Sequence, residues 1–205
     1  MRTLRVVAGA AAVLALGVAA AQAQPLTVVE VNAPAVNCVF HPACTITVSD
    51  TVGFIPLPYL AAPRTAFLQS RTFGGAPGTP AAGKAGYMYR SSLTQAGGSA
   101  DCLGGLVLNF GPGLKLPYAP GKLADVFVIT SGGLGSIGLR SAERFGEVIV
   151  FELAKMLCLE GGPNVSNTTF FFGLAADTPA MATAAQIFGS GSPPLYSVDA
   201  RVPSH

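Results

Sequence analysis

Two cysteines flank a histidine at regular spacing in Cys38-x-x-His41-x-x-Cys44, where three soft side chains could coordinate zinc or copper. A structural zinc site usually needs four ligands, and the only other histidine is His205, the last residue of the chain. We therefore expect no metal site, and coordination by Cys38, His41 and Cys44 stays open as the alternative to a disulfide.

The chain has four cysteines, Cys38, Cys44, Cys102 and Cys158, and an even number is typical of disulfides in an exported protein. Three pairings would satisfy this number. His41-Pro42 can reverse the chain between the first two cysteines, whereas Cys102 and Cys158 each lie at the edge of a strand-like segment. We expect Cys38–Cys44 and Cys102–Cys158, and the longer loop closed by the second pair should stabilise the fold by about 4 kcal/mol.

The stretch VFVITSGGLGSIG, residues 126–138, looks like a strand that enters Gly133-x-Gly135-x-x-Gly138, the spacing of a dinucleotide-binding fingerprint. In that fingerprint the glycines lead into a helix whose N-terminus receives the pyrophosphate. Here the following segment, 139–145, ends at Gly146, and no second parallel strand or acidic ribose partner follows. We expect no cofactor, and we interpret the glycines as a turn with positive φ between two strands.

Few residue types are available for catalysis. His41 is followed by Pro42, and no Gly-x-Ser-x-Gly elbow is present, so a hydrolase with a histidine base is not expected. An acid/base pair of carboxylates would need a geometry that sequence does not reveal. Its candidates are Asp50, Asp101, Asp125, Glu143, Glu147, Glu152, Asp177 and Asp199. We expect a non-enzymatic protein without catalytic residues.

Tyr87 and Tyr89 are two residues apart in a strand-like segment, which puts both rings on one face. They are the candidate platform for a ligand such as a sugar ring. The alternative is a half-buried pair with its hydroxyls at the surface, since tyrosine is common in strands anyway.

Short β-prone runs alternate with glycine and proline turns along the chain. The predicted strands are 26–31, 44–50, 66–73, 85–93, 103–110, 124–130, 147–153, 168–175 and 194–202. Helix is scarce: residues 139–145 could make two turns, and 178–188 is ambiguous because alanine favours helix. The pattern predicts an all-β, antiparallel and jelly-roll-like β-sandwich of about 8–10 short strands.

The N-terminus has the three regions of a secretory signal peptide. Arg2 and Arg5 precede an apolar run over residues 6–21, and Ala21-Gln22-Ala23 offers a cleavage site before Gln24. We therefore expect a signal peptide over residues 1–23 and a single secreted domain over 24–205, located in the periplasm or outside the cell.

Charge narrows the range of partners. Two of the twelve basic residues leave with residues 1–23, so ten basic residues face ten acidic ones in the remaining chain. Nucleic acids and anionic membranes select clustered positive charge, so we expect neither as a partner. No second long apolar run follows, and we expect no membrane span after signal removal.

Near the C-terminus, Asn167-Thr-Thr-Phe-Phe-Phe-Gly-Leu174 and Val198-Asp-Ala-Arg-Val-Pro203 resemble the closing strands of uncharacterised bacterial secreted β-sandwich proteins. Some members of that group carry a C-terminal sorting tail, and we expect none in this chain. The resemblance implies export and β architecture, and it implies no catalytic residues.

Two functions agree with these observations. The first is a non-enzymatic secreted or envelope-associated domain used for structure or interaction with a protein or surface partner. The second is a carrier or binder of a small apolar ligand in a β-barrel or inter-sheet cavity. A lined cavity of several hundred Å³ would favour the second function, and a packed core would favour the first.

Overall fold

The computed structural model describes residues 22–58, 60, 62–94, 96, 102–159, 167–189 and 195–204. These residues form one helix, α1 (Ala33–Phe40), and fourteen strands. The strands are β1 (Gln24–Pro25), β2 (Val28–Asn32), β3 (Ser49–Phe54), β4 (Phe67–Gly74), β5 (Ala85–Ser92), β6 (Leu103–Asn109), β7 (Leu116–Ala119), β8 (Lys122–Ala124), β9 (Val126–Ser131), β10 (Leu139–Phe145), β11 (Val148–Leu157), β12 (Phe171–Ala176), β13 (Ala180–Gly189) and β14 (Leu195–Pro203).

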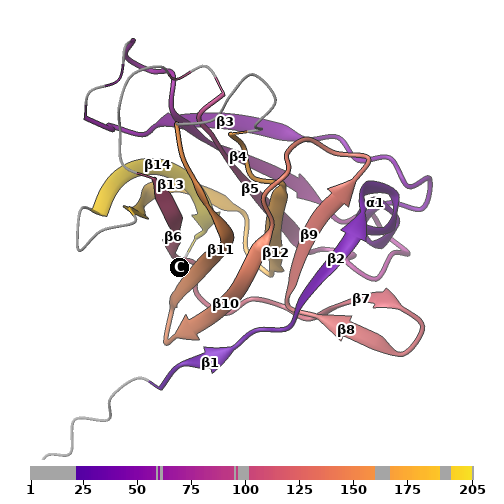
Figure 1. Cartoon of the computed structure of the whole chain (residues 1–205). Helices are drawn as coiled ribbons and strands as arrows, with labels where there is room; N and C mark the ends of the chain where they lie inside the picture. Colours follow the sequence, from indigo (N-terminus) through magenta and orange to yellow (C-terminus); the bar gives the residue numbers. More distant parts are fainter. Residues whose placement is uncertain are drawn as a thin grey trace, which may run out of the picture.

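Twelve strands form two six-stranded sheets that pack face to face (Figure 1). Sheet 1 has the order β1-β10-β11-β6-β13-β14, and sheet 2 has the order β2-β9-β12-β5-β4-β3. The remaining two strands, β7 and β8, form a separate hairpin. The predicted all-β sandwich is confirmed, with more strands than expected and with one parallel pair, β2 and β9.

Side chains alternate between the core and the outer face along each strand of sheet 2. In β5, Tyr87 and Tyr89 are fully buried between the sheets, whereas the next residue, Arg90, points to the outer face and is only half-buried. In β12, Phe172 packs in the same core and Phe171 belongs to a second cluster on the outer face. The same strands therefore build both the core and the floor of an outer layer.

The edge strands β3 and β14 meet at one side of the sandwich. A Cβ on Gly53 of β3 would lie 2.2 Å from the backbone oxygen of Asp199 on β14, so only glycine permits this approach. The backbone nitrogen of Arg201 in β14 donates a hydrogen bond of 3.2 Å to Ser70 Oγ in β4. These contacts join the two sheets along this edge.

Both segments considered as helix candidates are strands. Residues 139–145 form β10 beside β11, and the alanine-rich segment 178–188 lies largely in β13, which pairs with both β14 and β6. Hydrogen bonds to two neighbouring strands outweigh the few tenths of a kcal/mol per residue by which alanine favours helix.

The observed helix lies where no helix was expected. Asn32 caps α1, and its side chain accepts a hydrogen bond of 2.8 Å from the backbone nitrogen of Ala35. Pro34 suits the first turn, where a missing N–H costs nothing. The predicted strand 44–50 is correspondingly shortened, because only its last two residues belong to β3.

Helix α1 lies against sheet 2 and contacts β2, β9 and the β7–β8 hairpin (Figure 1). Val36, Val39 and Phe40 turn toward the sheet and are buried in the outer cluster. Phe40 meets Phe73 of β4 edge to face, with ring centroids 4.7 Å apart. Sheet 2 thus has a packed core on one face and a partly covered apolar layer on the other.

Candidate functional site

The outer layer contains a pocket of about 460 Å³ on the outer face of sheet 2. Its floor comes from strands β4, β5, β9 and β12, and its walls come from α1, residues 46–48 and the loop 132–134. The lining residues are Ala33, Val36, Asn37, Ile46, Val48, Arg71, Phe73, Met88, Ile129, Gly132, Gly133, Leu134 and Phe171.

The wall formed by α1 and residues 46–48 is held at several points. Cys38 near the end of α1 is bonded to Cys44, which fixes the start of the segment that leads to Ile46 and Val48. The carbonyl of Phe40 accepts a hydrogen bond of 2.8 Å from the backbone nitrogen of Ala76. The wall is therefore tied both to the disulfide and to the β4–β5 connection.

One end of the floor carries a polar network that crosses strands β3, β4 and β5. Arg71 donates hydrogen bonds of 2.8 Å from Nε and from a terminal nitrogen to the two oxygens of Asp50. Gln69 donates its amide to the same carboxylate at 2.8 Å. Gln69 also accepts a hydrogen bond of 3.1 Å from Nε of Arg90.

Aromatic rings hold the two guanidinium groups in this network. The guanidinium carbon of Arg71 lies 4.4 Å from the centre of the Phe171 ring, and that of Arg90 lies 5.4 Å from the same centre. Arg90 also lies 5.8 Å from the ring centre of Phe67. Phe171 lines the pocket, so both cations adjoin its floor.

These contacts shift the pKa values of the charged groups. The hydrogen bond from Arg71 lowers the pKa of Asp50, and the same hydrogen bond raises the pKa of Arg71. Burial, and then the charge of Arg71, lower the pKa of Arg90. All three groups are charged at neutral pH, so the network carries two positive charges and one negative charge.

The space between the sheets is filled by side chains. Tyr87 and Phe110 pack edge to face with ring centroids 5.2 Å apart, and Phe151 and Phe172 lie 5.1 Å apart. The pocket is thus outside the sandwich, on a face that the sequence analysis had not singled out.

Tyr87 and Tyr89 lie in this core and are not a ligand platform. Neither side chain is exposed. Their hydroxyls each donate a hydrogen bond of 2.6 Å, from Tyr87 to the carbonyl of Thr178 and from Tyr89 to that of Arg201. Tyr87 therefore connects sheet 2 to the bend before β13, and Tyr89 connects it to β14 of sheet 1.

The predicted disulfides Cys38–Cys44 and Cys102–Cys158 are both present. His41 is not brought to a metal centre: its Nδ1 accepts a hydrogen bond of 3.2 Å from the backbone nitrogen of Ala43. Among the described residues no three His, Cys, Asp or Glu side chains gather as metal ligands. His205 lies outside the described residues.

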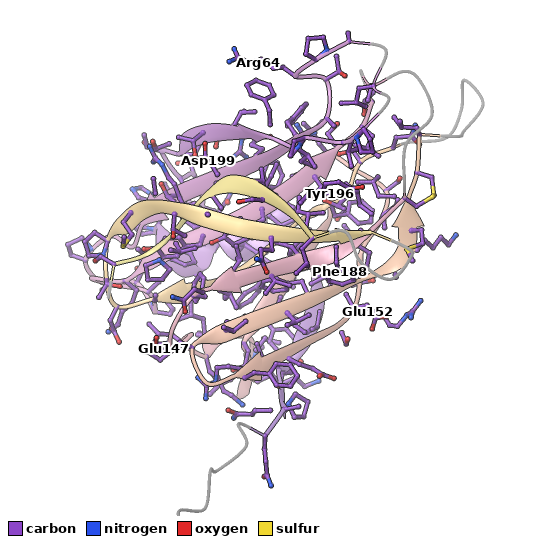
Figure 2. The ribbon with its side chains drawn as sticks, turned by 90° about the vertical axis from the view of Figure 1, so that its left-hand side faces the viewer. Arg64, Glu147, Glu152, Phe188, Tyr196 and Asp199 are labelled. Atoms are coloured by element: carbon purple, nitrogen blue, oxygen red, sulfur yellow. A yellow bond between two sulfur atoms is a disulfide. The ribbon has the colours of Figure 1, made fainter. Side chains whose placement is uncertain are left out.

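The candidate carboxylates are dispersed over the molecule. Asp125 accepts a hydrogen bond of 2.8 Å from the backbone nitrogen of Thr27 and lies 3.5 Å from Lys115. Asp177 pairs with Lys84. Asp101 is outside the described residues, and Glu147 and Asp199 lie on the surface (Figure 2).

Two carboxylates do lie near each other. Glu143 and Glu152 line a smaller hollow of about 150 Å³ on the outer face of sheet 1, where Figure 2 labels Glu152. Glu152 is bound by Arg140 at 2.7 Å and accepts a hydrogen bond from Ser141. Glu152 thus has protein partners, which is typical of a surface ion pair.

The glycine stretch links the two sheets. Gly132 and Gly135 have positive φ values of 71° and 108°, whereas Gly133 and Gly138 do not. The strand after this stretch, β10, belongs to the other sheet, so the turn is a crossover and not a hairpin. Gly132, Gly133 and Leu134 contribute the far wall of the pocket.

No protein-family model, curated protein or solved structure matches the chain. No helix within the described residues is long and apolar enough to cross a membrane. The class of protein defined here is a two-disulfide β-sandwich with a pocket on its outer face, and its function is argued from that pocket.

Sequence reasoning missed Arg71, Arg90 and Phe171 as site residues, and it treated Asp50 only as one of many carboxylates. A signal was present in residues 66–73, where Phe67, Gln69, Arg71 and Phe73 alternate with smaller side chains. A strand that carries a mixed aromatic and cationic face opposite a core face indicates a surface with specific contacts.

Proposed function

We propose that this chain is a non-enzymatic, exported domain that binds a small, mainly apolar ligand in the pocket beside α1. The observation that carries the proposal is the pocket itself, with a volume of about 460 Å³ and a lining that combines Val36, Met88 and Phe171 with the polar side chains of Asn37 and Arg71. Small-molecule sites are concave, mostly apolar and roughly 300–1,000 Å³ in volume.

The chemistry of the lining supports binding rather than catalysis. Arg71 is the only side chain with an ordinary ionisable group among the described residues that line the pocket. Arginine stays protonated and cannot act as a nucleophile or general base at neutral pH. The lining therefore supplies orientation and charge without the groups that move protons.

The construction of the pocket supports a preformed site. Its floor consists of paired strands, and the Cys38–Cys44 disulfide ties α1 to the segment that carries Ile46 and Val48. A site that is already ordered loses little conformational entropy when a ligand binds. A structural or interaction domain of the envelope remains the second candidate, because the sandwich interior is packed like that of an ordinary scaffold.

A neutral fluorescent compound, N-phenyl-1-naphthylamine, tests the proposal. We expect saturable, roughly one-to-one binding with enhanced fluorescence. Leu134→Glu puts a charge on the pocket wall, at a leucine that is 60% exposed, and should weaken binding about tenfold or more because a carboxylate avoids apolar surroundings. Leu195→Glu on β14 of sheet 1, where the leucine is 51% exposed, is the matched control. Absence of saturable binding to the wild-type protein would favour the interaction domain instead.

Export is a separate part of the proposal and has its own test. The two disulfides and the signal-like residues 1–23 support it. We expect the intact mass of the exported protein to equal that of a chain that begins at Gln24. A mass that includes residues 1–23 would count against export.

A further inference from the structure

We infer that the ligand is an apolar monocarboxylate whose carboxylate binds Arg90 while its apolar body occupies the pocket. The inference rests on the proposed function and assigns a chemical class to the ligand. Arg90 is not among the described lining residues, but its guanidinium lies 5.4 Å from the ring centre of Phe171, which lines the pocket and also contacts Arg71.

Asp50, the acidic group of the network, is already bound by other side chains. Both oxygens of Asp50 accept hydrogen bonds from Arg71, and one of them also accepts the amide of Gln69. Asp50 and Arg71 lie directly opposite each other in the β3–β4 register, so the bidentate geometry is set by the sheet. Asp50 thus neutralises Arg71 first.

Arg90 is oriented but lacks a carboxylate partner in the described part of the chain. Its Nε donates to Gln69, which fixes the plane of the guanidinium, and its two terminal nitrogens have no acceptor there. The rings of Phe67 and Phe171 restrict its side chain from two sides. A guanidinium held in this way presents a planar pair of donors that fits one carboxylate.

The charge of the site favours a single negative group. The network has one excess positive charge, and Arg90 is half-buried, so water screens this charge incompletely. Among the described residues that line the pocket there is no acidic side chain that would repel an anion. A monoanion with an apolar body matches both the charge and the lining, whereas a multiply charged phosphate would remain undercompensated.

Displacement of N-phenyl-1-naphthylamine by decanoate and by decanol tests the inference, since the two compounds differ only in the headgroup. We expect Arg90→Gln to weaken the affinity for decanoate about tenfold, the size expected for a lost charge-assisted hydrogen bond. The affinity for decanol should change by less than about twofold. Arg64→Gln is the matched control: Arg64 also stacks on a phenylalanine, Phe54, at 5.2 Å (Figure 2), but Phe54 is not a lining residue, whereas Arg90 stacks on Phe171, which is one.

Two further measurements keep the result decisive if Arg90→Gln folds poorly. Arg90→Lys retains the charge and should keep decanoate binding within about fivefold. Added salt should weaken the binding of decanoate to the wild-type protein and leave the binding of decanol unchanged. Equal effects of Arg90→Gln or of salt on both compounds would overturn the carboxylate assignment while leaving apolar binding intact. Failure of all three compounds to bind would overturn the proposed function together with this inference.

Discussion

Arg71 and Asp50 face each other across β4 and β3 and form a bidentate ion pair, with both hydrogen bonds at 2.8 Å. The pair is only partly exposed, with 30% of the Arg71 side chain and 33% of the Asp50 side chain accessible to solvent. It anchors the edge strand β3 to sheet 2 and holds one guanidinium over the ring of Phe171.

This ion pair makes stability depend on pH. The pKa of Asp50 lies below its ordinary value of 3.8, chiefly because Arg71 hydrogen-bonds to the charged form. A lowered folded-state pKa gives stabilisation that is complete above pH 3.8 and is lost as the pH falls through the folded value. We expect Asp50→Asn to cost less than about 1 kcal/mol at neutral pH, since the pair is partly screened by water.

Thermal melts of wild-type protein and Asp50→Asn across this pH range provide the measurement. The difference in melting temperature should shrink toward zero below pH 3.8. Asp199→Asn, at an exposed position on β14, is the control for replacement of a carboxylate (Figure 2). A difference that stays constant with pH would contradict the role of the carboxylate charge.

Gly135 is predicted to be intolerant of any side chain. Its φ is 108°, and a Cβ there would lie 2.1 Å from the backbone oxygen of Thr169. We expect Gly135→Ala to lower the free energy of unfolding by more than about 2 kcal/mol, because strain and a backbone clash add. Gly146→Ala is the matched control: its φ of 63° is also positive, but a Cβ would meet nothing within 4 Å.

The control variant should lose only about 1 kcal/mol, the cost of the left-handed backbone alone. Chemical denaturation of both variants measures the difference, and equal losses would show that the contact with Thr169 is unimportant.

Because we interpret the glycine stretch as a turn and not as a dinucleotide site, we expect NAD or ATP at millimolar concentration to leave the melting temperature of the wild-type protein unchanged. A nucleotide that binds the native state would raise this temperature.

The two disulfides should differ in what they control. Cys102–Cys158 joins residues 56 apart in sequence, and Cys38–Cys44 joins residues 6 apart. In the chain-entropy model, the corresponding losses on double alanine replacement are about 4 and about 2 kcal/mol. Removal of the shorter bridge also releases the segment leading to Ile46 and Val48 in the pocket wall.

We therefore expect Cys102→Ala/Cys158→Ala to reduce melting temperature most, and Cys38→Ala/Cys44→Ala to reduce binding of N-phenyl-1-naphthylamine most. Calorimetry and fluorescence titration on the two double variants separate these effects. If removal of Cys102–Cys158 reduced probe binding more than removal of Cys38–Cys44, the Cys38–Cys44 disulfide would not be what orders the pocket wall.

Burial of Tyr87 predicts a loss of stability at alkaline pH. Burial raises the pKa of Tyr87 to about 12 from an ordinary value of 10.0. A raised folded-state pKa gives stability that is complete below pH 10.0 and is lost as the pH rises toward about 12. Tyr87→Phe cannot ionise and should show a smaller alkaline loss, although it should cost about 1 kcal/mol at neutral pH through the hydrogen bond to Thr178.

Denaturation curves for wild-type protein and Tyr87→Phe between neutral pH and pH 12 check this expectation. Tyr118→Phe, at a half-buried position of the β7–β8 hairpin, is the control. Identical alkaline losses in wild type and Tyr87→Phe would show that another group controls unfolding at high pH.

Much of the β architecture could be predicted from local patterns. The strand predicted over residues 85–93 contains two tyrosines, which are common in strands, and it corresponds to β5 (Ala85–Ser92). Residues 139–145 and 178–188 were harder, because their local propensity does not exclude helix. Their pairing partners are distant in sequence, and those partners decide the outcome.

The candidate site was less accessible to sequence reasoning. Tyr87 and Tyr89 were correctly placed on one face, but a period of two does not say which face is buried. The same uncertainty hid Arg90, which is on the opposite face of the same strand. Only the packing of sheet 1 against sheet 2 assigns the tyrosines to the core and leaves Arg90 half-buried on the outer face.

The sequence by itself determined the fold class, because strand periodicity is a local property, and it favoured one of three cysteine pairings, which the structure confirms. Tertiary structure alone decided the pocket and its cation network. Asp50, Arg71, Arg90 and Phe171 come from four strands, and each contributes a side chain whose neighbours are set by sheet register. A site assembled from non-local pairings has no signature in a short stretch of chain, since its geometry exists only after the sheets have formed.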